Sequence, residues 1–240
     1  MAVVFTVWNR PRYLRQVLDS WAKVRGIGDV LLDFRCEPGC EESVAMCKAV
    51  DFADRRVHVN PVRLGDWRNV QQSLDRAFEI VPYAVQATDD HITSADVLEL
   101  HTWHRDTYVN DQSVLTLCAG RNPEAAEGGP AAVWRGQIMG WLPGFHRDKW
   151  AMLTPRWDES NATERGWWGW ISEHWCFSAG FYILRPALSR AQDIGEVGSR
   201  PVNMFEWHRS KCYSEDYPQQ QFFEVTGKRE CGYNSRIEAA

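Results

Sequence analysis

The chain has 240 residues, of which 44% are hydrophobic and 25% are charged; these values are typical of a globular protein and exclude disordered and collagen-like chains. The net charge of −5 argues against a surface devoted entirely to binding a polyanion. No stretch approaches 18 consecutive apolar residues and the chain opens without a leader pattern, so we expect a cytoplasmic protein without a membrane anchor.

The first ninety residues alternate between strand and helix patterns. Short apolar runs rich in β-branched residues predict strands at 3–7, 30–34, 56–60 and 83–87. Amphipathic spacing predicts helices that begin at Pro11 and span 41–50 and 67–78. This alternation predicts a parallel sheet with helices on its faces. Ligands of such sheets bind where the strands end at their carboxyl side.

The rest of the chain has weaker patterns. Ser94 is a good N-cap for a helix that runs to about 108, and a strand follows at 113–118. Residues 121–130 predict a loop, and helical patches are expected at 148–153 and 186–193. Most of the 13 tryptophans lie in this half. They predict either an aromatic core or a wall that stacks on sugars or bases.

Polar residues gather at the predicted strand ends. Asn9, Arg10, Glu37 and the pair Asp89-Asp90 all lie at or just beyond such ends. Two adjacent carboxylates beside a buried strand are costly unless a cation or hydrogen-bond donors compensate their charge. Carboxylate oxygens suit Mg²⁺ or Mn²⁺, which normally also bind substrate phosphates. The alternative is that the two aspartates only form a turn.

A series of motifs resembles the GT-A glycosyltransferases. Residues 4–21 resemble the start of family 2 enzymes and, more closely, of the N-acetylglucosaminyltransferase I type. Later landmarks follow in the same order: Arg63-Leu64-Gly65 with Asn69, Thr88-Asp89-Asp90 in the place of their Glu-Asp-Asp motif, Gly140-Trp141, Trp150, Leu153, Pro155 and Trp157, and then Arg185-Pro186, Ser189-Arg190 and Ile194-Gly195 with Gly198. The likeness spans about residues 3–200.

This resemblance implies an α/β fold of the GT-A, Rossmann-like type: a mixed, mostly parallel central sheet flanked by helices, with a Trp-rich acceptor-side C-terminal half. It implies a single domain over 1–240, in which about 1–110 bind the nucleotide sugar and about 111–240 face the acceptor. Residues against the donor would be Val7, Asn9, Arg10, Glu37 and Asn69. Asp89 would face the ribose, and Asp90 would hold a metal ion on the diphosphate.

The resemblance fails at one functional position. Its enzymes carry Trp-Asp-Asp-Trp, with a carboxylate that acts as the catalytic base, whereas this chain has Trp-Trp-Gly-Trp at 167–170. If this stretch is helical, Glu173 lies one turn after Gly169 on the same face. We therefore expect Glu173 to be the general base, with Asp216 and Glu215 in reserve. His208 is a further candidate for metal binding.

The sequence thus predicts a metal-dependent, inverting glycosyltransferase that uses Mn²⁺ or Mg²⁺ and a UDP-sugar. Its acceptor would be a glycan or a hydroxymethylated base in DNA, which would have to leave the stack to react. One alternative is a catalytically impaired protein that only binds nucleotide sugars. Another is a sugar nucleotidyltransferase, although its glycine-rich loop is missing between Trp8 and Pro11.

Overall fold

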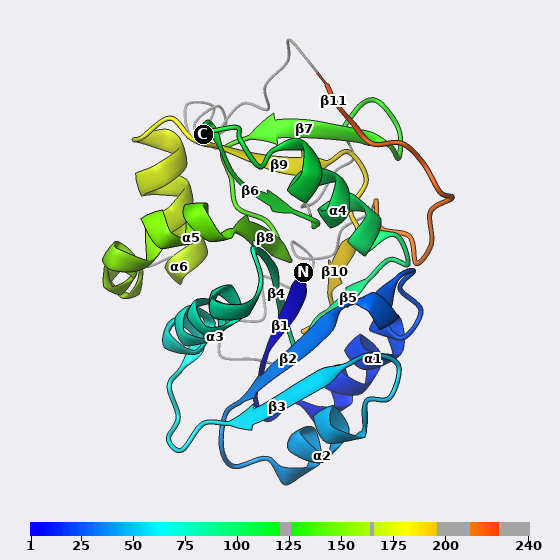
Figure 1. Cartoon of the computed structure of the whole chain (residues 1–240), viewed down its shortest axis with the longest axis vertical. Helices are drawn as coiled ribbons and strands as arrows, with labels where there is room; N and C mark the ends of the chain where they lie inside the picture. The colour runs from blue at the N-terminus through cyan, green and yellow to red at the C-terminus, as the bar shows by residue number, and fades with distance from the viewer. Residues whose placement is uncertain (121–125, 164–165, 196–211, 226–240) are drawn as a thin grey trace, which may run out of the picture.

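The computed structural model describes residues 1–120, 126–163, 166–195 and 212–225 (Figure 1). Within these ranges the central sheet has nine strands in the order β11-β7-β9-β6-β8-β4-β1-β2-β3, and β5 and β10 form a separate two-stranded sheet. Strand β1 pairs parallel with β2 and β4, and β2 pairs parallel with β3. The first third of the chain therefore builds a parallel half-sheet, as predicted.

This parallel half is made of four strands connected by helices. The strands are β1 (Ala2–Val7), β2 (Leu31–Cys36), β3 (Arg55–Val59) and β4 (Tyr83–Thr88). The helices are α1 (Pro11–Trp21), α2 (Glu41–Ala49) and α3 (Asp66–Ile80), with a 3-10 turn over Ile27–Asp29 before β2. Pro11 suits the first helical position because its fixed φ is already helical and it lacks the N–H that would have no partner there.

The second half adds a mixed set of strands and five short helical segments. The strands are β5 (His91–Thr93), β6 (Val114–Cys118), β7 (Ala132–Gly136), β8 (Pro143–His146), β9 (Tyr182–Pro186), β10 (Ala191–Asp193) and β11 (Phe223–Glu224). The helices are α4 (Val97–Thr107), α5 (Arg147–Leu153), η2 (Thr154–Ala162), α6 (Gly166–Trp170) and η3 (Ile171–Phe177). Strand β8 pairs antiparallel with both β4 and β6. It therefore joins the two halves into one continuous sheet.

The prediction of a helix over 186–193 is wrong. Strand β9 ends at Pro186, and β10 then pairs antiparallel with β5. The backbone N–H of Arg190 donates to the carbonyl of Ala119, and its carbonyl accepts from the N–H of Ser94. These tertiary hydrogen bonds use the backbone groups that a helix would pair internally, so the weak helical pattern does not form.

The predicted start of the helix after Ser94 is also wrong. Helix α4 begins at Val97, and Asp96 occupies the N-cap position. The Ser94 hydroxyl donates to Asp96 Oδ1 over 2.7 Å instead of capping a helix. The carboxylate of Asp96 makes no capping hydrogen bond either, because it is fully buried and pairs with Arg190, an interaction that local propensity does not reveal.

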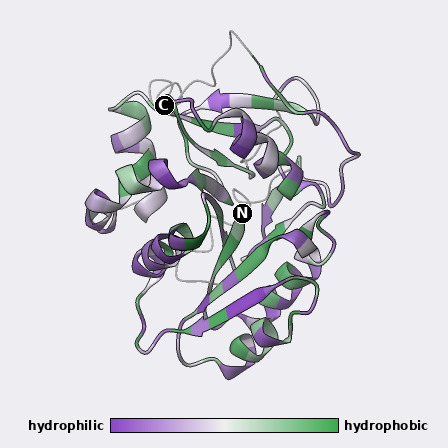
Figure 2. Ribbon diagram, viewed as in Figure 1, coloured by the Kyte–Doolittle hydropathy of each residue, from purple (hydrophilic) through white to green (hydrophobic). Residues whose placement is uncertain are grey.

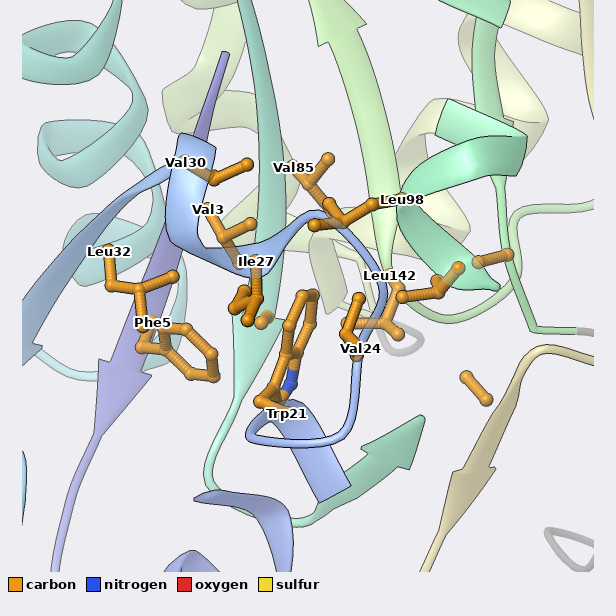
Figure 3. Close-up of a cluster of buried hydrophobic side chains, with 14 of the residues drawn as sticks. Val3, Phe5, Trp21, Val24, Ile27, Val30, Leu32, Val85, Leu98 and Leu142 are labelled. Atoms are coloured by element: carbon orange, nitrogen blue, oxygen red, sulfur yellow. The ribbon is translucent and has the colours of Figure 1, made fainter. Parts of the chain in front are cut away.

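Two hydrophobic layers cover the two faces of the sheet. Val3, Phe5 and Val7 of β1 pack with α1, α2 and α4, whereas Val4 packs with α3, α5 and α6. This alternation is the period of two of a strand buried on both sides. Figure 3 shows the first layer around Trp21. The edge strand β3 is coloured hydrophilic in Figure 2, which suits an edge because charged residues discourage pairing with another chain.

The tryptophans of the second half form much of the second layer. The five that are buried there are Trp150, Trp157, Trp167, Trp170 and Trp175. Neighbouring rings among them have centroids 4.8 to 6.1 Å apart, distances at which aromatic pairs attract. The aromatic-core interpretation is confirmed for these five residues. Their faces cannot also stack on a substrate unless the core opens.

A buried cluster of histidines surrounds the hydroxyl of Tyr83. This hydroxyl lies 3.0 Å from Nδ1 of His101 and 2.8 Å from Nδ1 of His104, and the ring of His146 stands edge-on to the tyrosine. Burial lowers the pKa of His101 to about 3. It also holds the pKa of His104 well below its ordinary value and lowers the pKa of His146. All three imidazoles are therefore neutral in the folded protein at neutral pH.

This cluster predicts acid sensitivity of the fold. Below pH 6.5 these histidines become protonated in the unfolded chain but stay neutral in the folded protein. The stability that their burial in the neutral form allows is therefore fully present above that pH and is lost as the pH falls. Each such histidine should lower the free energy of unfolding by about 1.4 kcal/mol per pH unit. Urea unfolding between about pH 6.5 and pH 5, where most carboxylates stay ionised, measures this slope. A slope of zero, or one that is unchanged in His101→Gln, would contradict the prediction.

Candidate functional site

The candidate site lies where β1 and β4 end. These strands are parallel neighbours, with Thr6 opposite Thr88, so their carboxyl ends meet at one edge of the sheet. Beyond β1 the chain passes through Trp8 and Arg10 into α1, and beyond β4 it passes through Asp89-Asp90 into β5. The structure thus brings together the polar residues that the sequence places at two separate strand ends.

Arg10 links both aspartates. Its Nη2 donates to Asp89 Oδ1, and its Nη1 donates to Asp90 Oδ2 over 2.6 Å. The backbone N–H of Trp8 donates to Asp89 Oδ2 over 2.9 Å. The side chains of Asp89 and Asp90 are 2% and 15% exposed, and that of Arg10 is 27% exposed. A guanidinium is suited to this place because its fork of donors can bridge two carboxylates at once.

The two carboxylates have different electrostatic environments. Burial raises the pKa of Asp89 above its ordinary value, although Arg10 and the Trp8 N–H oppose this. Burial would also raise the pKa of Asp90, but His91, Arg10 and the hydroxyl of Thr88 together hold it below its ordinary value. Asp90 is therefore the carboxylate of the pair that stays ionised most readily, which is the state that binds a cation.

Thr88 sets the tautomer of His91. Its hydroxyl donates to Asp90 Oδ1 over 2.6 Å and lies 2.9 Å from Nδ1 of His91. Because a hydroxyl has a single hydrogen, Thr88 must accept from His91, and Nδ1 of His91 carries the proton. In the neutral form of the ring Nε2 is then the nitrogen with the lone pair. It lies 3.9 Å from Asp90 Oδ1 and 4.0 Å from Asp193 Oδ2.

Asp193 reaches this cluster through the small sheet. In the β5–β10 ladder Asp193 is directly opposite His91, and the backbone N–H of Ile194 donates to the carbonyl of Asp90 over 2.9 Å. A Cβ on Gly195 would lie 2.9 Å from Asp90 Oδ2 and 3.1 Å from Asp193 Oδ1. A larger residue at this position would therefore have to displace the carboxylate of Asp90.

The residues present fit a divalent cation. One ligand atom from each of Asp90, His91 and Asp193 lies within 4.8 Å of the others. Two carboxylates and a neutral imidazole are ligands that Mn²⁺ accepts, and a hydrogen bond to the second nitrogen is the usual support of a metal-binding histidine. This edge of the sheet is thus a candidate metal site, and the role of Asp90 as a metal ligand stays a prediction.

Glu37 and Asn69 form hydrogen bonds at the carboxyl end of the neighbouring strand, β2. The carboxylate of Glu37 accepts hydrogen bonds from the backbone N–H groups of Leu64 and Gly65, over 3.0 and 2.8 Å. Asn69 accepts from Asn60 and donates to the carbonyl of Arg35. These bonds fix the 62–65 loop against the end of β2. The contact of both residues with a donor nucleotide stays a prediction.

Val7 and Asn9 flank Trp8 at the end of β1. Val7 is buried, and its carbonyl accepts from the N–H of Glu37 over 2.8 Å, whereas Asn9 is exposed. The guanidinium of Arg63 lies 3.8 Å from the centroid of the Trp8 ring. This stacked pair lies beside the aspartates. The site residues predicted from the sequence did not include Trp8, Thr88, His91 or Asp193. His91 directly follows the aspartates and could have been included, whereas Asp193 is joined to them only by tertiary pairing.

The remaining predicted residues lie elsewhere. Glu173 is on η3, which packs against the segment before β8 through a hydrogen bond from the Met139 N–H to the Ser172 hydroxyl. Trp141 of the same segment has its ring centroid 5.7 Å from that of His91. Asp216 pairs with Arg25, which follows the C-terminal end of α1, whereas Arg10 precedes its N-terminal end. The backbone carbonyl of Glu215 accepts a hydrogen bond from the N–H of Ala95. His208 is outside the described residues. The role of Glu173 as base stays a prediction.

In the described ranges no helix is long and apolar enough to span a bilayer.

Comparison with known proteins finds likeness in structure alone. No protein-family model and no curated protein matches the sequence. Among solved structures the chain is similar to S. aureus TarS 1–349, with a TM-score of 0.56 and 10% identity over 81% of this chain and 60% of that one. TarS 1–349 in complex with UDP-GlcNAc gives a TM-score of 0.48 and 12% identity, covering 65% and 47% of the two chains.

A third neighbour is the mannosyltransferase PcManGT from Pyrobaculum calidifontis in complex with GDP-Man and Mn²⁺, with a TM-score of 0.45 and 16% identity over 61% of this chain and 44% of that one. The chain thus spans from 44% to 60% of the length of these neighbours. Likeness at such identity shows the fold. The described residues have an α/β fold similar to that of TarS 1–349, with a large, mostly parallel sheet between helices, which confirms the predicted fold class.

Proposed function

We propose that this protein is a metal-dependent, inverting glycosyltransferase that moves a sugar from a nucleotide diphosphate donor, a UDP-sugar, to an acceptor hydroxyl. The observation that carries the proposal is the cluster of Asp89, Asp90, His91 and Asp193 where β1 and β4 end, in a fold shared with a glycosyltransferase. Open sheets with parallel strands bind nucleotides at this edge. The cluster also has the ligand chemistry that a metal–diphosphate complex requires.

The residues of the site then have separate tasks. Asp90, His91 and Asp193 would hold the ion, and a bound Mn²⁺ or Mg²⁺ would supply positive charge against the departing diphosphate. Asp89 faces the ribose and keeps Trp8 in place through its backbone N–H. Val7, Asn9, Arg10, Glu37 and Asn69 shape the donor side.

The acceptor side is assigned to the second half of the chain. Glu173 takes the proton of the acceptor hydroxyl as general base, and the oxygen attacks the anomeric carbon in line with the leaving group. Five of the tryptophans that motivated a DNA acceptor are buried in the core. They therefore give no support to a clamp on an extruded base, and the proposal names the acceptor by its hydroxyl group.

The test is the release of nucleoside diphosphate from a panel of nucleotide sugars in the presence of Mn²⁺. An active transferase should release it slowly by hydrolysis even without an acceptor. Glu173→Gln should slow transfer to an added acceptor and leave Mn²⁺ binding unchanged. Thermal stabilisation by nucleotide sugars without any release would show a binding protein. Formation of nucleotide sugar and diphosphate from nucleotide triphosphate and sugar phosphate would show a nucleotidyltransferase.

The metal ligands make a prediction that does not depend on turnover. Asp193→Asn should weaken Mn²⁺ binding at least about tenfold, because an amide oxygen replaces a charged ligand in nearly the same volume. Isothermal titration of the protein with Mn²⁺ measures the affinity. The matched control is Asp106→Asn on α4, whose carboxylate is exposed and pairs only with Arg105 in the described structure. Equal affinities of Asp193→Asn and the unmodified protein would remove Asp193 from the site.

A further inference from the structure

Arg10 and a metal ion would bind the same carboxylate, that of Asp90. Its Oδ1 accepts the hydroxyl of Thr88 and lies 3.9 Å from Nε2 of His91, and its Oδ2 accepts Nη1 of Arg10 over 2.6 Å. The carboxylate that belongs to the candidate metal cluster is thus already paired with a cationic side chain.

A divalent ion at Asp90 would bring excess positive charge to a site that already contains Arg10. Asp89 and Asp90 carry at most two negative charges, and Arg10 already balances one of them. A divalent ion beside Asp90 would be only a few ångströms from the guanidinium. Like charges at such distances repel strongly where the surroundings are largely buried. Binding of the ion therefore favours a state in which Arg10 has left Asp90.

We propose that Arg10 is the resident counter-cation of this site, that it competes with the divalent ion for Asp90, and that its release by the ion makes the guanidinium available to a phosphate group. The proposal rests on the metal site of the proposed function. Arg10 can move in this way because its side chain is partly exposed and only its backbone carbonyl is tied to the first turn of α1. Binding of metal and of the phosphate ligand would then be coupled through one side chain.

The first test compares Arg10→Gln with the unmodified protein by titration with Mn²⁺ alone. Without its competitor the site should bind Mn²⁺ about tenfold more tightly or more, in line with the loss of a close like charge. Arg10→Lys, which keeps the charge, should stay near the unmodified protein. The control Arg63→Gln removes a positive charge from the exposed stack on Trp8 and touches neither carboxylate. It should change the affinity little.

The second test adds UDP, because the proposal predicts opposite effects on two ligands. Arg10→Gln should bind Mn²⁺ more tightly but bind UDP more weakly in saturating Mn²⁺. A residue that merely supports the local fold would weaken both. Arg10→Gln should also melt at a lower temperature without metal, and Mn²⁺ should raise its melting temperature by more than that of the unmodified protein.

Three results would overturn the proposal: equal or weaker Mn²⁺ binding by Arg10→Gln, an equal gain in Arg63→Gln, or the absence of Mn²⁺ binding in both proteins. If Arg10→Gln folds only with metal, the rescue of its fold by Mn²⁺ itself supports the competition. All of these readouts use the protein with Mn²⁺ or UDP. A failure of sugar transfer would therefore count against the proposed function and leave the competition measurable.

Discussion

Asp90→Asn should lower the rate of nucleoside diphosphate release by about 10²- to 10³-fold, the loss typical when one group that stabilises transition-state charge is removed. Asparagine retains the shape of aspartate and can still accept the hydroxyl of Thr88 at Oδ1. It loses the negative charge that would hold the ion beside His91 and Asp193 in the proposed site. The rate should be measured with Mn²⁺ and donor at saturating concentrations, so that the change reports the chemical step.

The matched control for this prediction is Asp106→Asn, which makes the same chemical change on an exposed residue of α4. Its rate of release should equal that of the unmodified protein. Circular dichroism and thermal melting of both variants should show that they fold. Full activity of a folded Asp90→Asn would exclude Asp90 from catalysis and would remove the basis of the proposed function.

The fold of the first ninety residues could be predicted because its signals are local. The stripe of Leu14, Val17, Leu18 and Trp21 that predicts α1 is the stripe that is buried. The alternation within β1 identifies a strand buried on both faces. In a parallel sheet the strand ends coincide at one edge. The position of Arg10 beside Asp89 and Asp90 therefore followed from the strand order, without knowledge of any side-chain contact.

The second half was less predictable because its structure depends on partners that are distant in sequence. Asp193 joins His91 only because β10 pairs with β5, and the local pattern around it indicates a helix. Asp96, rather than Ser94, stands at the N-cap position of α4, and its carboxylate pairs with the buried Arg190. In both cases tertiary interactions outweigh a weak local preference, a balance that a single sequence does not reveal.

Arg190→Met should lower the free energy of unfolding by about 3–5 kcal/mol, the cost of leaving one partner of a buried ion pair without its counter-charge. Arg190 and Asp96 are both fully buried, and Nε of Arg190 donates to Asp96 Oδ2 over 3.0 Å. The guanidinium also donates to the carbonyls of Leu188 and Pro130. It thus connects α4, the loop before β7 and the segment before β10. Urea unfolding monitored by tryptophan fluorescence measures the change.

The matched control is Arg156→Met, which removes the same group from an exposed pair with Glu159 and should change stability little, since water and salt screen such pairs. The double variant Arg190→Met/Asp96→Leu supplies the sharper comparison. Replacing both buried charges by apolar groups removes the unpaired carboxylate, so much of the lost stability should return. If the double variant is as unstable as Arg190→Met, the hydrogen bonds of Arg190 to the backbone, rather than the ion pair, hold this part of the fold.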